Sequence, residues 1–142
     1  GTALYDSLVF AAQYFFGVKG QKALLLLSDG EDEASRFGAD EALETARRAG
    51  VLVYAIGLKE AAARRTHRQI LERLARETGG RAFFVADTAE LPAVYAAIQT
   101  DLRSQYLLAY QSSSTRPITE LRSIEVQVEG GYRVRAMSGY YP

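Results

Sequence analysis

The chain has 142 residues, a length that suits one compact domain and excludes a second large one. Hydrophobic residues make up 48% of the chain and charged residues 24%, so it can bury a core and is not a disordered sequence. Seventeen basic residues balance seventeen acidic ones, which excludes an overall field that would attract nucleic acid or an anionic membrane. With no cysteine and a single histidine, neither a disulfide framework nor a thiolate or multi-histidine metal site can form.

The first residues suggest that the chain is a fragment, and they give no sign of membrane targeting. The longest apolar run covers residues 23–27, which is far too short to span a membrane. The chain begins at Gly1 and Thr2 without a basic and then apolar signal segment. We therefore expect no membrane insertion, and the abrupt start suggests a piece cut from a longer protein.

Residues 1–103 alternate short apolar runs with amphipathic stretches of helical length, which is typical of a parallel sheet covered by helices. Apolar spacing from Leu4 to Phe16 predicts a first helix that ends at Gly17 and Gly20. The run from Leu24 to Leu27 has no polar alternation, so it predicts a strand with both faces buried.

The rest of this zone repeats the pattern. Gly50 and the Gly79–Gly80 pair are placed to end two further helices. Because crossovers between parallel strands are right-handed, the three strands should lie side by side in chain order. The expected elements are a helix over residues 37–49, a strand over 51–57, a helix over 61–78, a strand over 81–85 and a helix capped by Thr88.

After Arg103 the apolar period changes to two, which predicts antiparallel strands over residues 104–111, 122–130 and 132–141. Side-chain parity favours a three-residue loop of Glu129, Gly130 and Gly131, with a glycine at positive φ. Such a loop would set Val128 opposite Tyr132 and Val126 opposite Val134. We therefore interpret residues 1–103 as an α/β domain and residues 104–142 as an antiparallel extension packed on it or on a neighbouring domain.

Acidic residues gather where the first predicted strand ends. Open α/β sheets bind ligands at this rim, and the strand delivers Asp29 to it. A hard cation with oxygen ligands would relieve the repulsion among the acids of residues 29–33. A calcium loop is excluded because Gly30 holds its second position and not its sixth. Glu31, Asp32 and Glu33 are better explained as solvated acids ahead of a helix, whereas Asp29 is the candidate metal ligand.

Several stretches together resemble the von Willebrand factor type A domain. They are "GTALYDSL" opening a helix, "LLLLSDGEDE" at a strand end, "VLVYAIGL", and "LARETGGRAFFV" before a final helix. The tail, "LRSQYLLAYQ" and "IEVQVEGGYRVRAMSGYY", resembles the bacterial, acidobacterial-type subgroup of these domains. The resemblance covers nearly the whole chain and implies a three-layer, doubly wound, Rossmann-like, mostly parallel sheet. It also suggests a secreted or cell-envelope bacterial protein.

The same resemblance implies a metal-ion-dependent adhesion site, in which Mg²⁺ or Mn²⁺ binds an acidic group of a partner protein. Thr2 and Asp29 match two of the family's metal ligands. The family's D-x-S-x-S motif would precede Gly1 and has no counterpart here, so we expect an N-terminally truncated fold; "YDSLV" at residues 5–9 lies within the first helix and is no substitute. A hydroxyl and a carboxylate alone hold such a cation weakly, so we expect metal to be absent or weakly bound in this chain.

The missing motif has a structural consequence. If it held the central strand of the sheet, the run from Leu24 to Leu27 would present an unpaired apolar edge, which is a template for pairing with another chain. Three arrangements would cover it: two copies pair along the edge as a homodimer, the tail strands fold back over it, or the parent chain fills the place.

The leading hypothesis is a protein-binding module and not an enzyme. One alternative is a metal-assisted hydrolase of the α/β class that uses Asp29, although the sequence has no phosphate-binding glycine motif and no nucleophile elbow. The other is a scaffold domain with a vestigial metal site and an assembly role for the tail hairpin. We interpret His67 and the arginines of residues 64–76 as solvated helix surface, and the nine tyrosines mostly as core or sheet face.

Overall fold

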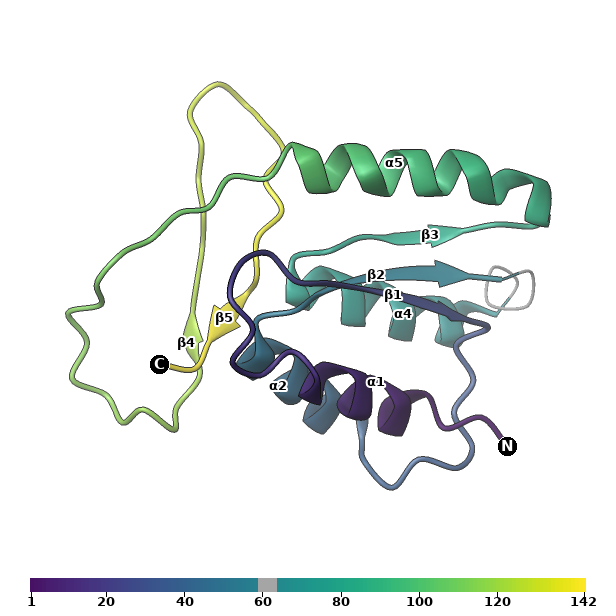
Figure 1. The fold of residues 1–142 in the computed structure, drawn as a ribbon, viewed down its shortest axis with the longest axis horizontal. Coiled ribbons are helices and arrows are strands. Elements are labelled where there is room, and N and C mark those ends of the chain that lie inside the picture. Colours follow the sequence, from purple (N-terminus) through teal and green to yellow (C-terminus); the bar gives the residue numbers. More distant parts are fainter. Residues whose placement is uncertain (59–63) are drawn as a thin grey trace.

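The computed structural model describes residues 1–58 and 64–142, which form an α/β body and an extended tail (Figure 1). The part of the predicted third helix that falls on residues 59–63 lies outside this description. The elements are α1 (Leu4–Gln13), β1 (Ala23–Ser28), α2 (Ala39–Ala49), β2 (Leu52–Gly57), α4 (Arg65–Thr78), β3 (Ala82–Phe84), the short 3₁₀ helix η1 (Thr88–Glu90), α5 (Leu91–Arg103), β4 (Arg122–Ser123) and β5 (Gly139–Tyr140).

The body is built on a parallel sheet whose strand order, β1-β2-β3, confirms the prediction. β1 pairs with β2 from Ala23 opposite Leu52 to Ser28 opposite Gly57. All three strands run the same way, so their carboxyl ends meet at one rim of the sheet.

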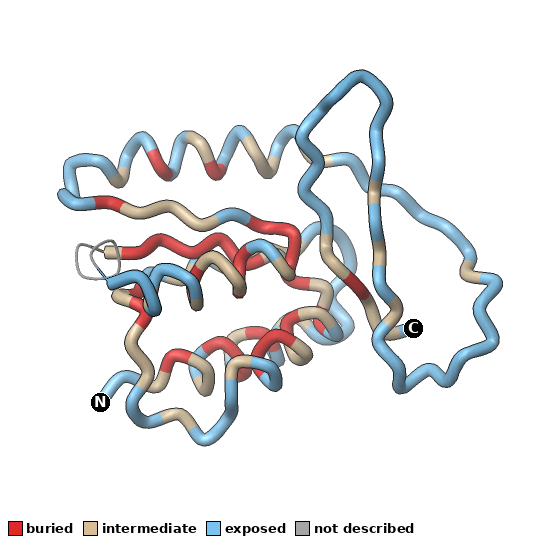
Figure 2. Tube along the Cα trace, turned by 180° about the vertical axis from the view of Figure 1, so that it is seen from behind, coloured by how far each residue is buried: buried red, intermediate tan, exposed pale blue. Residues whose placement is uncertain are grey.

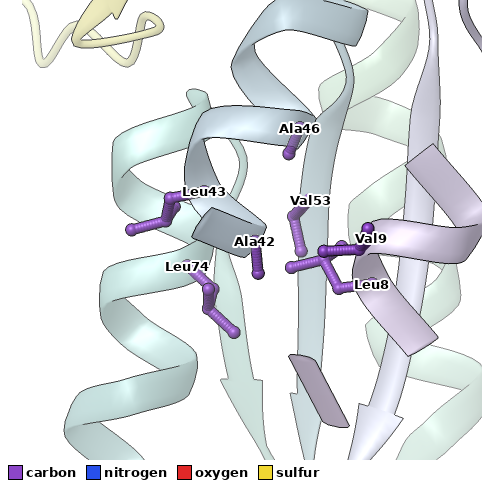
Figure 3. Packing of buried hydrophobic residues seen from close by; sticks show 7 residues of the cluster. All are labelled: Leu8, Val9, Ala42, Leu43, Ala46, Val53 and Leu74. Carbon is purple, nitrogen blue, oxygen red and sulfur yellow. The ribbon is translucent and has the colours of Figure 1, made fainter. Parts of the chain in front are cut away.

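Helices cover the sheet from two sides (Figure 1). On one side α1, α2 and α4 enclose a core around Val53, while on the other α5 packs Val94 and Ile98 against β2. The inward residues predicted for α2 are all buried, and Gly50 ends that helix in the left-handed conformation (φ 66°), as predicted. Figure 3 shows the members of the first cluster, which are Leu8, Val9, Ala42, Leu43, Ala46, Val53 and Leu74.

The prediction that β1 is buried on both faces is wrong. Leu24 and Leu26 pack against the helical core, but Leu25 and Leu27 are 47% and 51% exposed. These two leucines lie on the α5 side of the sheet, where α5 packs on residues of β2 and β3. Across the described residues β1 pairs only with β2, so its other edge is free.

The tail contains much less strand than its sequence pattern predicts. Residues 104–111 form no strand, and the other two predicted strands reduce to the pair β4 and β5, which sets Arg122 opposite Tyr140. The predicted loop would have set Arg122 opposite Ser138, so the register is displaced by two residues. A shift of two keeps every side chain on its predicted face, and apolar alternation therefore cannot distinguish the two registers. Gly130 has the expected positive φ (96°).

The tail does not fold back over β1, which removes one of the three expected arrangements. It is anchored instead to the helices: Ser138 Oγ accepts a hydrogen bond from Arg47 (2.8 Å), and Arg135 pairs with Asp101 at the end of α5 (2.7 Å). A Cβ on Gly79 would lie 2.7 Å from the backbone nitrogen of Met137, so the contact with α4 is close. Most of the tail is exposed (Figure 2).

Two smaller expectations need correction. Asp87, and not Thr88, caps the final helical segment, because its carboxylate accepts the Ala89 N–H (2.9 Å). Tyrosines are less buried than predicted: Tyr54 is in the core, but Tyr106 is 92% exposed. Within the two described segments no helix is both long and apolar enough to cross a membrane.

Candidate metal centre at the carboxyl end of the sheet

The loop after β1 begins with a tight turn that holds Asp29 at the rim. Ser28 Oγ accepts the Gly30 N–H (3.0 Å), and the Asp29 carboxylate accepts the Glu31 N–H (3.1 Å). Gly30 has φ +82°, a conformation that favours glycine. The turn thus fixes the backbone around the acid that sequence reasoning selected, and that side chain is only half-buried.

Thr2 lies against the same loop. Its carbonyl oxygen accepts hydrogen bonds from Glu33 N (2.9 Å) and Ala34 N (3.1 Å), a few residues after Asp29. The residue as a whole is exposed. The fold therefore ties the two predicted ligand segments together through the backbone, at one end of the sheet.

Asp32 has a role that sequence reasoning missed. Its carboxylate accepts the N–H groups of Leu4 (2.7 Å) and Tyr5 (3.3 Å), so it caps α1 from a distant loop. Ser35 completes the link, since its hydroxyl donates to Asp32 and accepts the Asp6 N–H (3.0 Å). The predicted solvated acid is a fixed part of the scaffold.

The pKa of Asp32 follows from this arrangement. Burial disfavours the charged carboxylate, but hydrogen bonds from the Ser35 hydroxyl and from the backbone N–H groups of Tyr5, Leu4 and Ser35 outweigh that effect. They hold the pKa below its usual range. Asp32 is therefore a charged cap at neutral pH, and its Oδ1 accepts the hydrogen bonds from Leu4 N, Tyr5 N and the Ser35 hydroxyl.

His67 also belongs to the rim, contrary to its interpretation as a solvated surface residue. It is half-buried on the first turn of α4, and its Nδ1 lies 3.2 Å from the carbonyl oxygen of Asp29. A Cβ on Gly30 would come within 2.7 Å of His67 Cβ. His67 and Asp29 are 38 positions apart in the sequence, so no local sequence pattern could have predicted this contact.

The arginines of α4 behave as the solvated interpretation expects. Arg68 pairs with Glu72 one turn later (2.9 Å), and Arg73 pairs with Glu77 (3.0 Å). Arg73 also pairs with Asp40 of α2. These side chains are about half exposed and neutralised by acids, which leaves that interpretation in place.

The donors at the rim suit a divalent cation in kind but not in number. The Thr2 hydroxyl and the Asp29 carboxylate are hard oxygen donors of the type that Mg²⁺ and Mn²⁺ prefer. Among residues 1–58 and 64–142, however, no three acidic, histidine or cysteine side chains lie close enough to hold a metal together. Within those ranges the predicted site therefore lacks a cluster of three such ligands.

Known proteins resemble the chain in fold. The structure of the conserved hypothetical protein BatB from Bacteroides thetaiotaomicron aligns with a TM-score of 0.57 and 18% identity, covering 74% of this chain and 61% of that one. An uncharacterized membrane spanning protein from Vibrio fischeri aligns with a TM-score of 0.51 and 24% identity, covering 70% and 56%. The chain thus spans about three fifths of the length of these relatives.

Among curated proteins none matches the chain. Residues 1–97 match the von Willebrand factor type A domain family, over the α/β body and not the tail. On this match and on the parallel sheet with helices on both faces, the chain belongs to the von Willebrand factor type A domain family.

Proposed function

We propose that this chain is a protein-binding module in which Thr2 and Asp29 supply two oxygen ligands to Mg²⁺ or Mn²⁺, and the cation binds an acidic group of a partner protein. Domains of this family generally mediate protein interactions and commonly bind these ions. The proposal makes the chain a binding protein and not an enzyme.

The observation that carries the proposal is the backbone link between the two ligand segments. Thr2 is bonded to Glu33 and Ala34, while the turn at Gly30 fixes Asp29 at the rim. Asp29 keeps one carboxylate oxygen outside the hydrogen bond to Glu31, which suits it to a ligand role. Asp32 has a structural role instead, because its Oδ1 accepts the first two N–H groups of α1 and the Ser35 hydroxyl.

Two ligands alone would hold a cation weakly, because Mg²⁺ requires near-octahedral oxygen coordination and keeps its waters tightly. An acidic group of the partner would add a third, charged ligand. Partner binding and cation binding should therefore strengthen each other, in the manner of two ligands that share one site.

Calorimetric titration with Mn²⁺ tests the proposal. Wild type should show weak, saturable binding that Asp29→Ala abolishes, since the only carboxylate ligand is gone. Glu120→Gln is the control, because it removes an exposed acid of the tail and should leave binding unchanged. Equal binding by wild type and Asp29→Ala, or no saturable binding by wild type, would contradict the proposal.

A scaffold role is the second candidate, favoured because no three acidic, histidine or cysteine side chains cluster among the described residues. It predicts a folded chain that takes up no metal and is unaffected by a chelator. A hydrolase that uses Asp29 remains the enzymatic alternative, and metal-dependent turnover in a phosphatase and esterase screen would support it. We further propose a secreted or cell-envelope location for the protein, as its family resemblance suggests.

A further inference from the structure

We propose that Asp32 is a positioning residue of the cation site: by holding the start of α1, it sets the direction in which Thr2 presents its hydroxyl beside Asp29. The inference rests on the proposed function, because it takes Thr2 and Asp29 as the two ligands of the cation. It begins from the hydrogen bonds that join the loop after β1 to the first turn of α1.

Thr2 is held by the loop at its carbonyl group. The carbonyl oxygen accepts the N–H groups of Glu33 (2.9 Å) and Ala34 (3.1 Å). Both bonds end on one oxygen atom, and a carbonyl accepts hydrogen bonds over a broad range of directions, so they fix a point of the backbone more firmly than its orientation. The direction of the Thr2 side chain therefore depends on a second attachment of the chain close to this point.

Asp32 supplies the second attachment. Its Oδ1 accepts the Leu4 N–H (2.7 Å) and the Tyr5 N–H (3.3 Å), which are the first two of α1. Ala3, the residue before the helix, has no side chain that could cap these groups, so they need an acceptor from elsewhere in the chain. Thr2 and Leu4 flank Ala3, and the same loop therefore holds the backbone on both sides of that residue.

Further hydrogen bonds keep Asp32 itself in place. The Ser35 hydroxyl donates to Asp32 Oδ1 (2.5 Å) and accepts the Asp6 N–H (3.0 Å). The Asp6 carboxylate in turn accepts the N–H groups of Arg36 (2.8 Å) and Phe37 (3.0 Å). The loop and the first turn of α1 thus bind each other reciprocally, and together they form one bonded unit that carries both proposed ligands.

This unit should raise the affinity for the cation without touching it. A ligand that is already oriented loses less conformational freedom when it binds. Removing a group that orients a metal ligand typically lowers metal affinity by about 10- to 100-fold. Because Asp32 acts on Thr2 through the backbone, we expect an effect near the lower end of this range.

Titration with Mn²⁺, followed by the electron paramagnetic resonance signal of the free ion, tests the proposal. Asp32→Ala should raise the Kd for Mn²⁺ about tenfold. Asp32→Asn keeps an oxygen acceptor for the same N–H groups and should restore most of the wild-type affinity. Asp87→Ala is the matched control, because Asp87 also caps a helical segment, through the Ala89 N–H (2.9 Å); its Kd should equal that of wild type.

A double-mutant cycle separates positioning from a general loss of stability. If Asp32 acts through Thr2, Thr2→Ala raises the Kd about as much as Asp32→Ala, and the two changes together raise it no further. Independent effects would multiply instead, to about a hundredfold. Ser35→Ala removes the hydroxyl that supports Asp32 and keeps the cap, so it should weaken binding by a smaller factor even where Asp32→Ala fails to fold.

The outcomes distinguish this inference from the function on which it rests. Binding that depends on Asp29 but is unchanged in both Asp32→Ala and Ser35→Ala, or a cycle whose effects multiply, would overturn the inference and leave the cation site in place. Equal losses in Asp32→Asn and Asp32→Ala would also overturn it, because the carboxylate charge would then act on the cation directly. No saturable binding by wild type would overturn both proposals.

Discussion

The body and the tail both contain apolar segments that predict strands, but their structures are very different. In the body, five of the six residues of β2 are buried. In the tail, residues 104–111 form no strand, and Tyr106 and Leu107 are 92% and 87% exposed. The surroundings of the two segments differ sharply, since only β2 lies between two strands and under helices.

An apolar periodic segment forms a stable strand only where neighbouring strands and helices pack against it. β2 has a strand on each side and helices over both faces, so its hydrogen bonds and its side chains are satisfied together. Residues 104–111 have neither, and a short isolated strand is at best marginally stable in water. Stability should therefore be concentrated in the body, and the same substitution should differ in effect between the two regions.

The largest expected effect comes from Leu74, a buried residue of the core cluster in Figure 3. Leu74→Ala leaves a cavity and should lower the free energy of unfolding by about 2–5 kcal/mol. Leu107→Ala, the same change in the tail, should alter it by less than about 0.5 kcal/mol. Urea unfolding followed by circular dichroism measures both. Equal losses would show that the tail is as tightly packed as the body.

The next effect concerns the anchor between the two regions. Arg47 is largely buried, pairs with Glu77 and donates to Ser138. Arg47→Ala removes both contacts while Arg73 still pairs with Glu77, so it should cost about 2 kcal/mol. Amide exchange should accelerate from Ser138 onward. Arg76→Ala is the control: its guanidinium lies 3.9 Å from the same carboxylate but is exposed, so the change should be small. Unchanged amide exchange in Arg47→Ala would contradict the proposed anchor.

A smaller effect is expected at the cap of α1. Asp32→Ala removes the acceptor for the Leu4 and Tyr5 N–H groups and should cost about 1–2 kcal/mol. Because the folded pKa of Asp32 is lowered, this contribution is present above its ordinary pKa of about 3.9 and is lost as the pH falls through the folded value. The difference in unfolding free energy between wild type and variant should therefore shrink in acid. A difference independent of pH would exclude the charged cap.

The smallest effect lies in the tail. Hydrogen bonds from Tyr110, then Ser112 and Arg122, lower the pKa of Tyr140 to about 8. A lowered pKa stabilises the ionised form, so the β4–β5 contact should gain stability as the pH rises from about 8 toward 10 and lose it below. Absorbance titration should detect one tyrosine that ionises early in wild type and is absent in Tyr140→Phe. A titration identical in both proteins would contradict this arrangement.

Sequence reasoning predicted the body well because its elements are determined locally and by short-range packing. The helix ending at Gly50 and the strand order both follow from nearby residues and from right-handed crossovers. The burial of β1 was mispredicted because an apolar run shows what a strand could bury and not what is present to cover Leu25 and Leu27. The register of the tail strands was mispredicted for a related reason, because a displacement of two residues leaves the apolar alternation unchanged.

The candidate site was predicted in part. Asp29 follows from its place at a strand end, and Thr2 from resemblance; the hydrogen bonds of Thr2 to Glu33 and Ala34 agree with their placement at one rim. Asp32 and His67 were missed because their contacts cross 28 and 38 positions of sequence. Contacts between residues so far apart in the chain leave no periodic pattern in a single sequence.

Paramagnetic broadening by Mn²⁺ in a two-dimensional amide spectrum tests the central claim most directly, because it reports where the ion binds as well as whether it binds. The proposed site predicts that the amide signals of Thr2, Asp29 and Gly30 broaden at the lowest Mn²⁺ concentrations, and that Asp29→Ala removes this selectivity. Broadening that begins instead at surface acids such as Glu41 and Glu44, or that is unchanged in the variant, would contradict a cation site at the rim.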